Sequence, residues 1–141
     1  MLLEQQQQHG AQCLPAAAAI DTAQPEVSFN TTIVPIVQRN CSLPACHGDL
    51  NNSLGIYLPS DAARIYESLK KPSTANLKLD VVKPSAPADS YLMHKIDGTQ
   101  CGLDANCVKK DCGNVMPPDR PLSFDDRSAI RRWIAQGAKD N

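Results

Sequence analysis

The sequence predicts a small all-α domain of about four helices, joined by long loops and stapled by disulfides. Several segments carry apolar residues at helical spacing, and capping residues flank them. The 141 residues include eleven Pro and seven Gly, but only two Phe, three Tyr and one Trp. A loop-rich domain with so few large apolar side chains is rarely stable by itself. We therefore expect a disulfide, metal or cofactor to complete the core. Six cysteines are available for that purpose.

The composition divides the chain into an irregular tail over residues 1–26 and a domain over residues 27–141. The tail holds a Gln run, an Ala run and two prolines, and it shows no signal-peptide pattern. We therefore expect that the natural start lies upstream or that the chain is a processed form. No stretch is long enough to span a bilayer. The net charge of -1 gives no reason to expect a nucleic-acid partner.

The first helix is predicted over residues 28–40. Its apolar positions recur at helical spacing and are Phe29, Ile33, Ile36 and Val37. Pro35 should kink this helix or confine its regular part to one side. The helix leads directly into Cys41.

Two shorter helices are predicted in the middle of the chain. Ser60 is expected to cap the first, which runs to about Leu69. The second covers residues 90–96 and ends at Gly98. Between them, residues 77–80 alternate in polarity and predict a brief extended segment.

The last predicted helix follows Ser123, which with Asp126 approximates a capping box. Its apolar stripe consists of Ile130, Trp133 and Ile134. Gly137 supplies a stop signal at its C-terminal end.

The segment Cys41-Ser-Leu-Pro-Ala-Cys46-His47-Gly48 carries the strongest functional signal. Two cysteines followed at once by histidine are typical of covalent haem attachment, with thioether bonds from both sulfurs and the imidazole on the iron. The spacer between the cysteines has four residues, whereas the usual motif has two. The alternative is a disulfide between Cys41 and Cys46.

Met116 is the candidate for the second iron ligand. It precedes two prolines, which restrict the backbone and would hold a weak thioether ligand in place. Met93 and His94 are the rival ligands, but their position in a short predicted helix favours a core role for Met93 and a surface role for His94.

The remaining cysteines are disulfide candidates: Cys13, Cys101, Cys107 and Cys112. Four cysteines allow three connectivities. A zinc site including His94 is an alternative, but the spacings are not those of a compact zinc knuckle. A disulfide within residues 101–112, or from Cys13 to that segment, would stiffen the loop before Met116.

In this order the motifs resemble small monohaem class I c-type cytochromes, and most of all a divergent branch found beside or within larger bacterial redox proteins. The matching segments within residues 27–139 are 36–41, 46–48, 82–92, 116–118 and 130–138. The resemblance implies a cytochrome c-like fold, with Cys41 and Cys46 as haem anchors and His47 and Met116 as the axial iron ligands. It also implies that Phe29, Ile33 and Trp133 pack beside the haem, where the first and last helices cross.

The expected function is therefore one-electron transfer through one covalent haem c, without catalysis at the iron because both axial positions are filled. The expected partners are redox proteins, including a larger membrane-associated or extracytoplasmic complex. Haem attachment and the cysteine content indicate a periplasmic or otherwise extracytoplasmic location in a bacterium. Two alternatives stay open: a haem-free, disulfide-stapled accessory subunit, and a haem enzyme or sensor with an open iron site.

Overall fold

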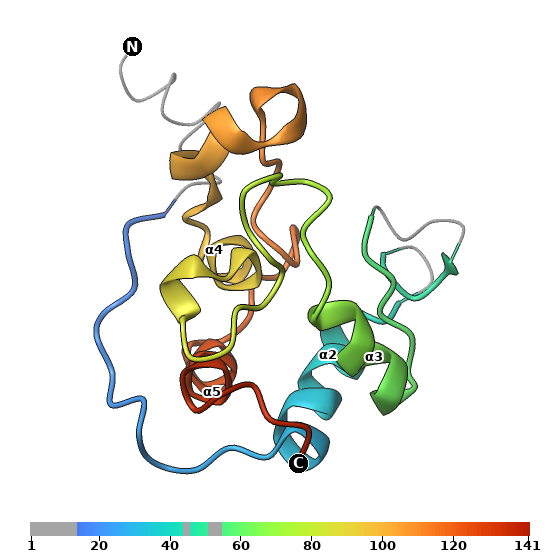
Figure 1. Cartoon of the computed structure of the whole chain (residues 1–141), viewed down its shortest axis with the longest axis vertical. Helices are drawn as coiled ribbons and strands as arrows, with labels where there is room; N and C mark the ends of the chain where they lie inside the picture. The colour runs from blue at the N-terminus through green and yellow to red at the C-terminus, as the bar shows by residue number, and fades with distance from the viewer. Residues whose placement is uncertain (1–13, 44–45, 51–54) are drawn as a thin grey trace.

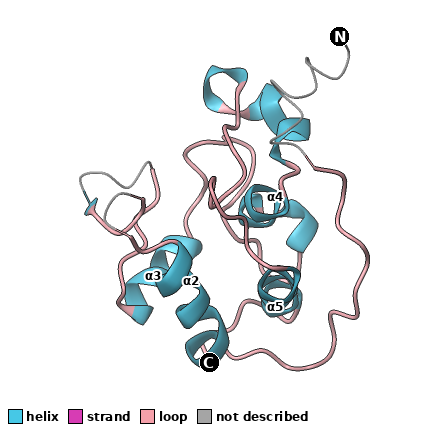
Figure 2. Ribbon diagram, turned by 180° about the vertical axis from the view of Figure 1, so that it is seen from behind, coloured by secondary structure: helices cyan, strands magenta, loops and turns pink. Residues whose placement is uncertain are grey.

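The computed structural model describes residues 14–43, 46–50 and 55–141. Within these ranges the chain is helical and forms no strand, only isolated β-bridges, so the predicted all-α class is confirmed (Figure 2). The α-helices are α2 (Val34–Asn40), α3 (Ala62–Leu69), α4 (Tyr91–Asp97) and α5 (Phe124–Ala135). Shorter helical pieces are a π-helical turn (Phe29–Ile33) and three 3-10 segments (Pro87–Asp89, Gln100–Asn106, Val108–Lys110). In the described part, no helix is long and apolar enough to cross a membrane.

The first predicted helix is divided into a π-helical turn and α2. Ser28 caps the turn, and its Oγ accepts the Thr31 N–H at 3.2 Å. Pro35 lies in the first turn of α2, where its missing N–H removes no helical hydrogen bond. The predicted apolar positions Phe29, Ile33, Ile36 and Val37 are all buried. Pro35 therefore confines the regular α-helix to its C-terminal side, one of the two expected outcomes.

Helix α3 starts one residue later than predicted. The N-cap is Asp61, whose carboxylate accepts the Ala63 N–H at 3.0 Å, and not Ser60. A carboxylate at the cap also interacts favourably with the positive end of the helix dipole. Ile65 and Leu69 are buried on one face, as the spacing predicts.

Helix α4 matches its prediction, whereas the extended segment before it does not exist. Ser90 precedes the helix and Gly98 ends it in the left-handed conformation, with φ of 77°. Residues 77–80 form turns and an isolated bridge, and the Leu77 N–H donates to the Asn106 carbonyl at 3.2 Å. The Leu77 side chain is 74% exposed, so the alternating pattern does not reflect a half-buried strand.

Helix α5 begins and ends as predicted. Ser123 Oγ accepts the Asp126 N–H at 3.1 Å, and Gly137 adopts φ of 108° just beyond the helix. The stripe of Ile130, Trp133 and Ile134 is buried.

An aromatic cluster joins the first helical turn to α3 and α5. The Phe29 ring lies 5.1 Å from that of Tyr66 and 5.2 Å from that of Trp133, between ring centroids. The C-terminal residue closes this end, because the Asn141 side chain accepts the Phe29 N–H at 2.8 Å. Figure 1 shows α5 beside α4, with α2 and α3 together on the other side of the molecule. The first and last helical elements thus share one core.

Residues 14–28 have no regular structure and run along the outside of the molecule toward α2 (Figure 1). The segment is held to α5 by side chains of that helix and of the residue after it. Gln136 Nε2 donates to the carbonyls of Thr22 and Pro25 at 3.0 and 2.9 Å. Arg132 Nε donates to the Asp21 carbonyl at 2.9 Å. The described part of the predicted tail is therefore attached to the domain.

Candidate functional site

One cavity of about 370 Å³ is lined by Cys41, Cys46, His47 and Met116. These residues come from two segments about 70 positions apart, one after α2 and one before α5. The volume lies within the range of small-molecule and cofactor pockets. Most of the remaining wall is apolar and includes Ile56, Leu58, Val81, Leu92 and Ile96. The residues that the sequence singles out therefore share one apolar cavity.

The cysteine side of the cavity is a loop that closes on itself through short-range hydrogen bonds. Its first residue continues α2, because the Cys41 N–H donates to the Val37 carbonyl at 2.8 Å. The His47 N–H then returns to the Cys41 carbonyl at 3.2 Å, and the Gly48 N–H donates to the Leu43 carbonyl at 3.0 Å. These bonds join residues 41–43 to residues 47 and 48, and both cysteines line the cavity.

Position 48 has no room for a side chain, so it requires glycine. A Cβ atom there would overlap the backbone of Ser42 and reach that of Leu43. Because the obstacle is backbone, no side-chain rotation could relieve it. The glycine after the histidine thus allows the close approach that folds the loop.

The hydrogen bonds of His47 fix the orientation of its ring. Nδ1 lies 3.0 Å from the Ile56 carbonyl, and the His47 carbonyl accepts the Leu58 N–H at 2.7 Å. A carbonyl only accepts, so Nδ1 carries the proton and a neutral ring has its lone pair on Nε2. A backbone carbonyl on one ring nitrogen is a common arrangement for a histidine that binds metal through the other.

Cys41 and Cys46 are thiols that form no disulfide in the structure. Burial, together with a smaller effect of the nearby Cys46, raises the pKa of Cys41 to about 11. Cys41 is therefore protonated at neutral pH, which slows its oxidation and its reaction with disulfides. The Cys41–Cys46 disulfide, which was the alternative interpretation of this motif, is therefore not formed in this structure.

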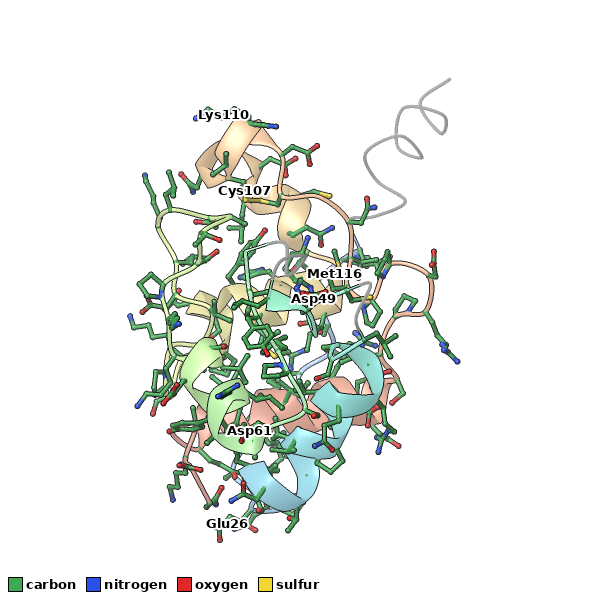
Figure 3. All side chains as sticks on the ribbon, turned by 90° about the vertical axis from the view of Figure 1, so that its right-hand side faces the viewer. Glu26, Asp49, Asp61, Cys107, Lys110 and Met116 are labelled. Atoms are coloured by element: carbon green, nitrogen blue, oxygen red, sulfur yellow. A yellow bond between two sulfur atoms is a disulfide. The ribbon has the colours of Figure 1, made fainter. Side chains whose placement is uncertain are left out.

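The methionine side of the cavity is held by a disulfide and by α4. Cys107 and Cys112 are joined, with an S–S distance of 1.99 Å, so the predicted bridge within residues 101–112 is present. The Met116 N–H donates to the Lys95 carbonyl at 2.8 Å. Figure 3 shows the disulfide at Cys107 and, closer to the centre of the molecule, Met116.

The disulfide removes two of the ligands that the alternative zinc site would need, because Cys107 and Cys112 cannot form thiolates while they are bonded to each other. Among the residues that the structure describes, no group of three His, Cys, Asp or Glu side chains is placed to hold a metal ion. Cys101 lies half-buried in the segment Gln100–Asn106. The fourth disulfide candidate, Cys13, lies outside the described residues.

The rival ligands line a different, smaller cavity of about 260 Å³ beside α4. Met93 is 2% exposed and belongs to the core, as predicted. Both ring nitrogens of His94 lie 2.8 Å from oxygen atoms, Nδ1 from the Thr99 hydroxyl and Nε2 from the Ala88 carbonyl. Neither side chain reaches the cavity that Met116 lines.

Phe29, Ile33 and Trp133 were expected beside the cofactor, but none of them lines the cavity. Their side chains are almost completely buried, and Phe29 and Trp133 pack on each other and on Tyr66. Aliphatic residues such as Leu58 form the cavity wall instead. The aromatic cluster therefore joins the helices of the core without forming the pocket.

Sequence reasoning missed Lys95, which also lines the cavity. Burial lowers the pKa of this lysine, while Asp111, Cys101 and Asp104 act in the opposite direction. Its helix was predicted, but the sequence contained no signal that α4 would face the segment before Met116, because that contact joins distant parts of the chain.

Comparison with known proteins gave no match. No protein-family model, no curated protein and no solved structure is significantly similar to the chain. The function must therefore be argued from the cavity itself.

Proposed function

We propose that the protein is a monohaem c-type cytochrome that carries single electrons between redox partners. One observation carries this proposal: two thiols, an imidazole and a thioether from separate segments line one apolar cavity. Cysteine, histidine and methionine are the residues from which c-type haem sites are built. The cytochrome c-like architecture is part of the same proposal and builds on the helical class of the described residues.

The chemistry of the cavity residues suits a porphyrin. A macrocycle with two apolar faces needs aliphatic walls, and Ile56, Leu58 and Val81 offer them from loops. Leu92 and Ile96 add a wall from α4. A cofactor enclosed by these side chains would also supply the apolar interior that the aromatic-poor sequence lacks.

Each site residue has a separate role in this proposal. Cys41 and Cys46 would each add a thiol across one vinyl group, so that two thioether bonds hold the porphyrin. His47 would ligate the iron through Nε2, since Nδ1 is committed to Ile56. Met116 would supply a second iron ligand through its thioether sulfur. Reversible change between ferric and ferrous iron is the chemistry that the bound haem supplies.

The protein would set the reduction potential of the haem through the iron ligands and through burial of the cofactor. A thioether is a weak, soft ligand that favours the ferrous state and so raises the reduction potential. Around a bound haem, the aliphatic side chains would exclude water, which would destabilise the charge of ferric iron and act in the same direction. With His47 and Met116 on both sides, the iron would have no open position for a substrate, so this arrangement favours a carrier over an enzyme.

The partners and the location follow from this function. A carrier of single electrons needs redox proteins as donor and acceptor, either free or within a larger membrane-associated or extracytoplasmic complex. The Cys107–Cys112 disulfide is compatible with an oxidising compartment such as the periplasm.

A visible spectrum of the protein purified from a haem-maturing host tests the proposal. The expected result is a sharp ferrous α-band, together with a weak ferric band from iron–methionine ligation. Neither spectrum should change when cyanide or carbon monoxide is added briefly. Met116→Leu, which conserves the volume of the side chain, should abolish the weak band and let both ligands bind. Absence of a Soret band would refute the proposal, and ligand binding by the unmodified protein would favour the open-site enzyme.

A further inference from the structure

Lys95 is a half-buried cation in the cavity wall with an unusual partner. No carboxylate lies within ion-pair distance of it in the described part of the chain. Its Nζ instead donates to the Cys112 carbonyl at 2.6 Å. An ammonium group that loses water needs a strong compensating interaction, and charge-assisted hydrogen bonds are roughly twice as strong as neutral ones. The position of Cys112 is therefore fixed by a costly and specific contact.

The backbone of the same residue makes a second contact with the same segment. The Lys95 carbonyl accepts the Met116 N–H at 2.8 Å. Lys95 thus binds both ends of residues 112–116, its side chain at the first residue and its main chain at the last. Both ends of the segment are therefore hydrogen-bonded to the same residue of α4.

Other contacts hold the beginning of this segment less directly. The Tyr91 hydroxyl donates to the same Cys112 carbonyl at 3.3 Å, and Gln100 Nε2 donates to the Gly113 carbonyl at 3.0 Å. The Lys95 bond is the shortest of the three, and it has the only charged donor. The segment is also held by the Cys107–Cys112 disulfide, and the carboxylates of Asp104 and Asp111 accept the N–H groups of Cys112 and Gly113 at 2.9 and 2.8 Å. Of the side chains that donate a hydrogen bond to this segment, Lys95 is therefore expected to contribute most to its position.

We infer that Lys95 is a positioning residue that holds Met116 at the cavity by fixing residues 112–116 on α4. The inference rests on the proposed function, in which Met116 is an iron ligand. The need for such a residue follows from the weakness of the bond between a thioether and iron. A thioether bond to iron does not by itself offset the entropy lost when a flexible loop is ordered, so the loop must be ordered by other contacts.

The test compares Lys95→Met, which keeps the apolar stem and removes the donor, with Lys95→Arg, which keeps a charged donor. Lys71→Met is the matched control, because Lys71 is exposed and lies outside the cavity wall. The first readout is the weak iron–methionine band relative to total haem, measured in purified holoprotein. The second is hydrogen exchange at the Met116 amide, measured by NMR. This second readout does not depend on the haem.

Lys95→Met should lose most of the iron–methionine band while keeping its haem, and its Met116 amide should exchange about tenfold faster. Lys95→Arg should recover much of the band, and Lys71→Met should match the unmodified protein. If Lys95→Met does not fold, Lys95→Gln should show the same changes at smaller amplitude. An unchanged band and unchanged exchange in the Lys95 variants would overturn the inference. If the unmodified protein carries no haem, the proposed function fails, and amide exchange alone decides whether Lys95 orders the segment.

Discussion

The two sides of the cavity are built by different means. On the cysteine side, residues 41–43 and 46–48 are joined by bonds among near neighbours, such as the His47 N–H to the Cys41 carbonyl. On the methionine side, residues 107–118 are held by a disulfide and by α4, through Lys95. The eight-residue motif therefore contains many of the contacts that shape one side, and the remaining ones reach only the nearby residues 56–59. The other side depends on contacts that form only when the chain has folded.

The largest expected effect follows from removal of the imidazole on the cysteine side. In His47→Ala, the iron should lose its proximal ligand and give a high-spin spectrum, and added imidazole should restore the low-spin form. His94→Ala is the matched control, because His94 lies outside this cavity. A low-spin spectrum for His47→Ala without added imidazole would show that His47 is not the ligand.

The next effect tests the close packing of the cysteine loop. Gly48→Ala places a Cβ against the Ser42 backbone and should lower the free energy of unfolding by about 1–3 kcal/mol. Gly102→Ala is a good control, since a Cβ at Gly102 would meet nothing within 4 Å. Denaturant unfolding of both variants measures the difference. Equal stability of the two would show that the loop opens at little cost.

The third effect follows from removal of the disulfide on the methionine side. The bridge closes a short loop, with a sequence separation of five, so the Cys107→Ala, Cys112→Ala double variant should lose about 2 kcal/mol of stability. Haem content should stay the same, because neither cysteine belongs to the attachment motif, while the iron–methionine band should weaken. Loss of haem from this variant would mean that the two sides are not independent.

The smallest effect concerns the two thiols before haem attachment. Because burial raises the pKa of Cys41 to about 11, this thiol should react slowly with iodoacetamide at pH 7.5 in the folded, haem-free chain. Its reaction should accelerate steeply as the pH approaches that pKa, since the thiolate is the reacting form. Peptide mapping by mass spectrometry gives the rate for each cysteine. Rapid alkylation of Cys41 at pH 7.5 would contradict the buried position.

Local features of the fold were predictable because their causes lie within a few residues. The cap at Ser123 and the stop at Gly98 follow from short-range hydrogen bonds and backbone conformation. The alternation at residues 77–80 gave a wrong prediction, because a four-residue pattern is too short to distinguish a strand from turns. Local bonds to Asn76 form a turn there, and one further bond reaches Asn106, which is far away in the sequence.

Long-range contacts were not predictable from one sequence. Asp97, at the end of α4, is buried against α5, where Arg131 Nη2 lies 2.7 Å from its carboxylate and Arg127 lies 3.4 Å away. Nothing in the residue types indicated this pairing, just as nothing indicated that Lys95 would reach Cys112. The sequence identified the candidate site residues, whereas the structure supplied the contacts that bring Met116 to the cysteine loop.

Covalent haem on the cysteine side is the central claim, and one peptide tests it directly. Trypsin should release residues 40–64 as a single peptide that contains Cys41, Cys46 and His47, because no Lys or Arg interrupts it before Arg64. In protein from a haem-maturing host, tandem mass spectrometry should find this peptide carrying the mass of one haem through both cysteines. Recovery of the same peptide with two free thiols, or with a Cys41–Cys46 disulfide and no haem, would contradict the account.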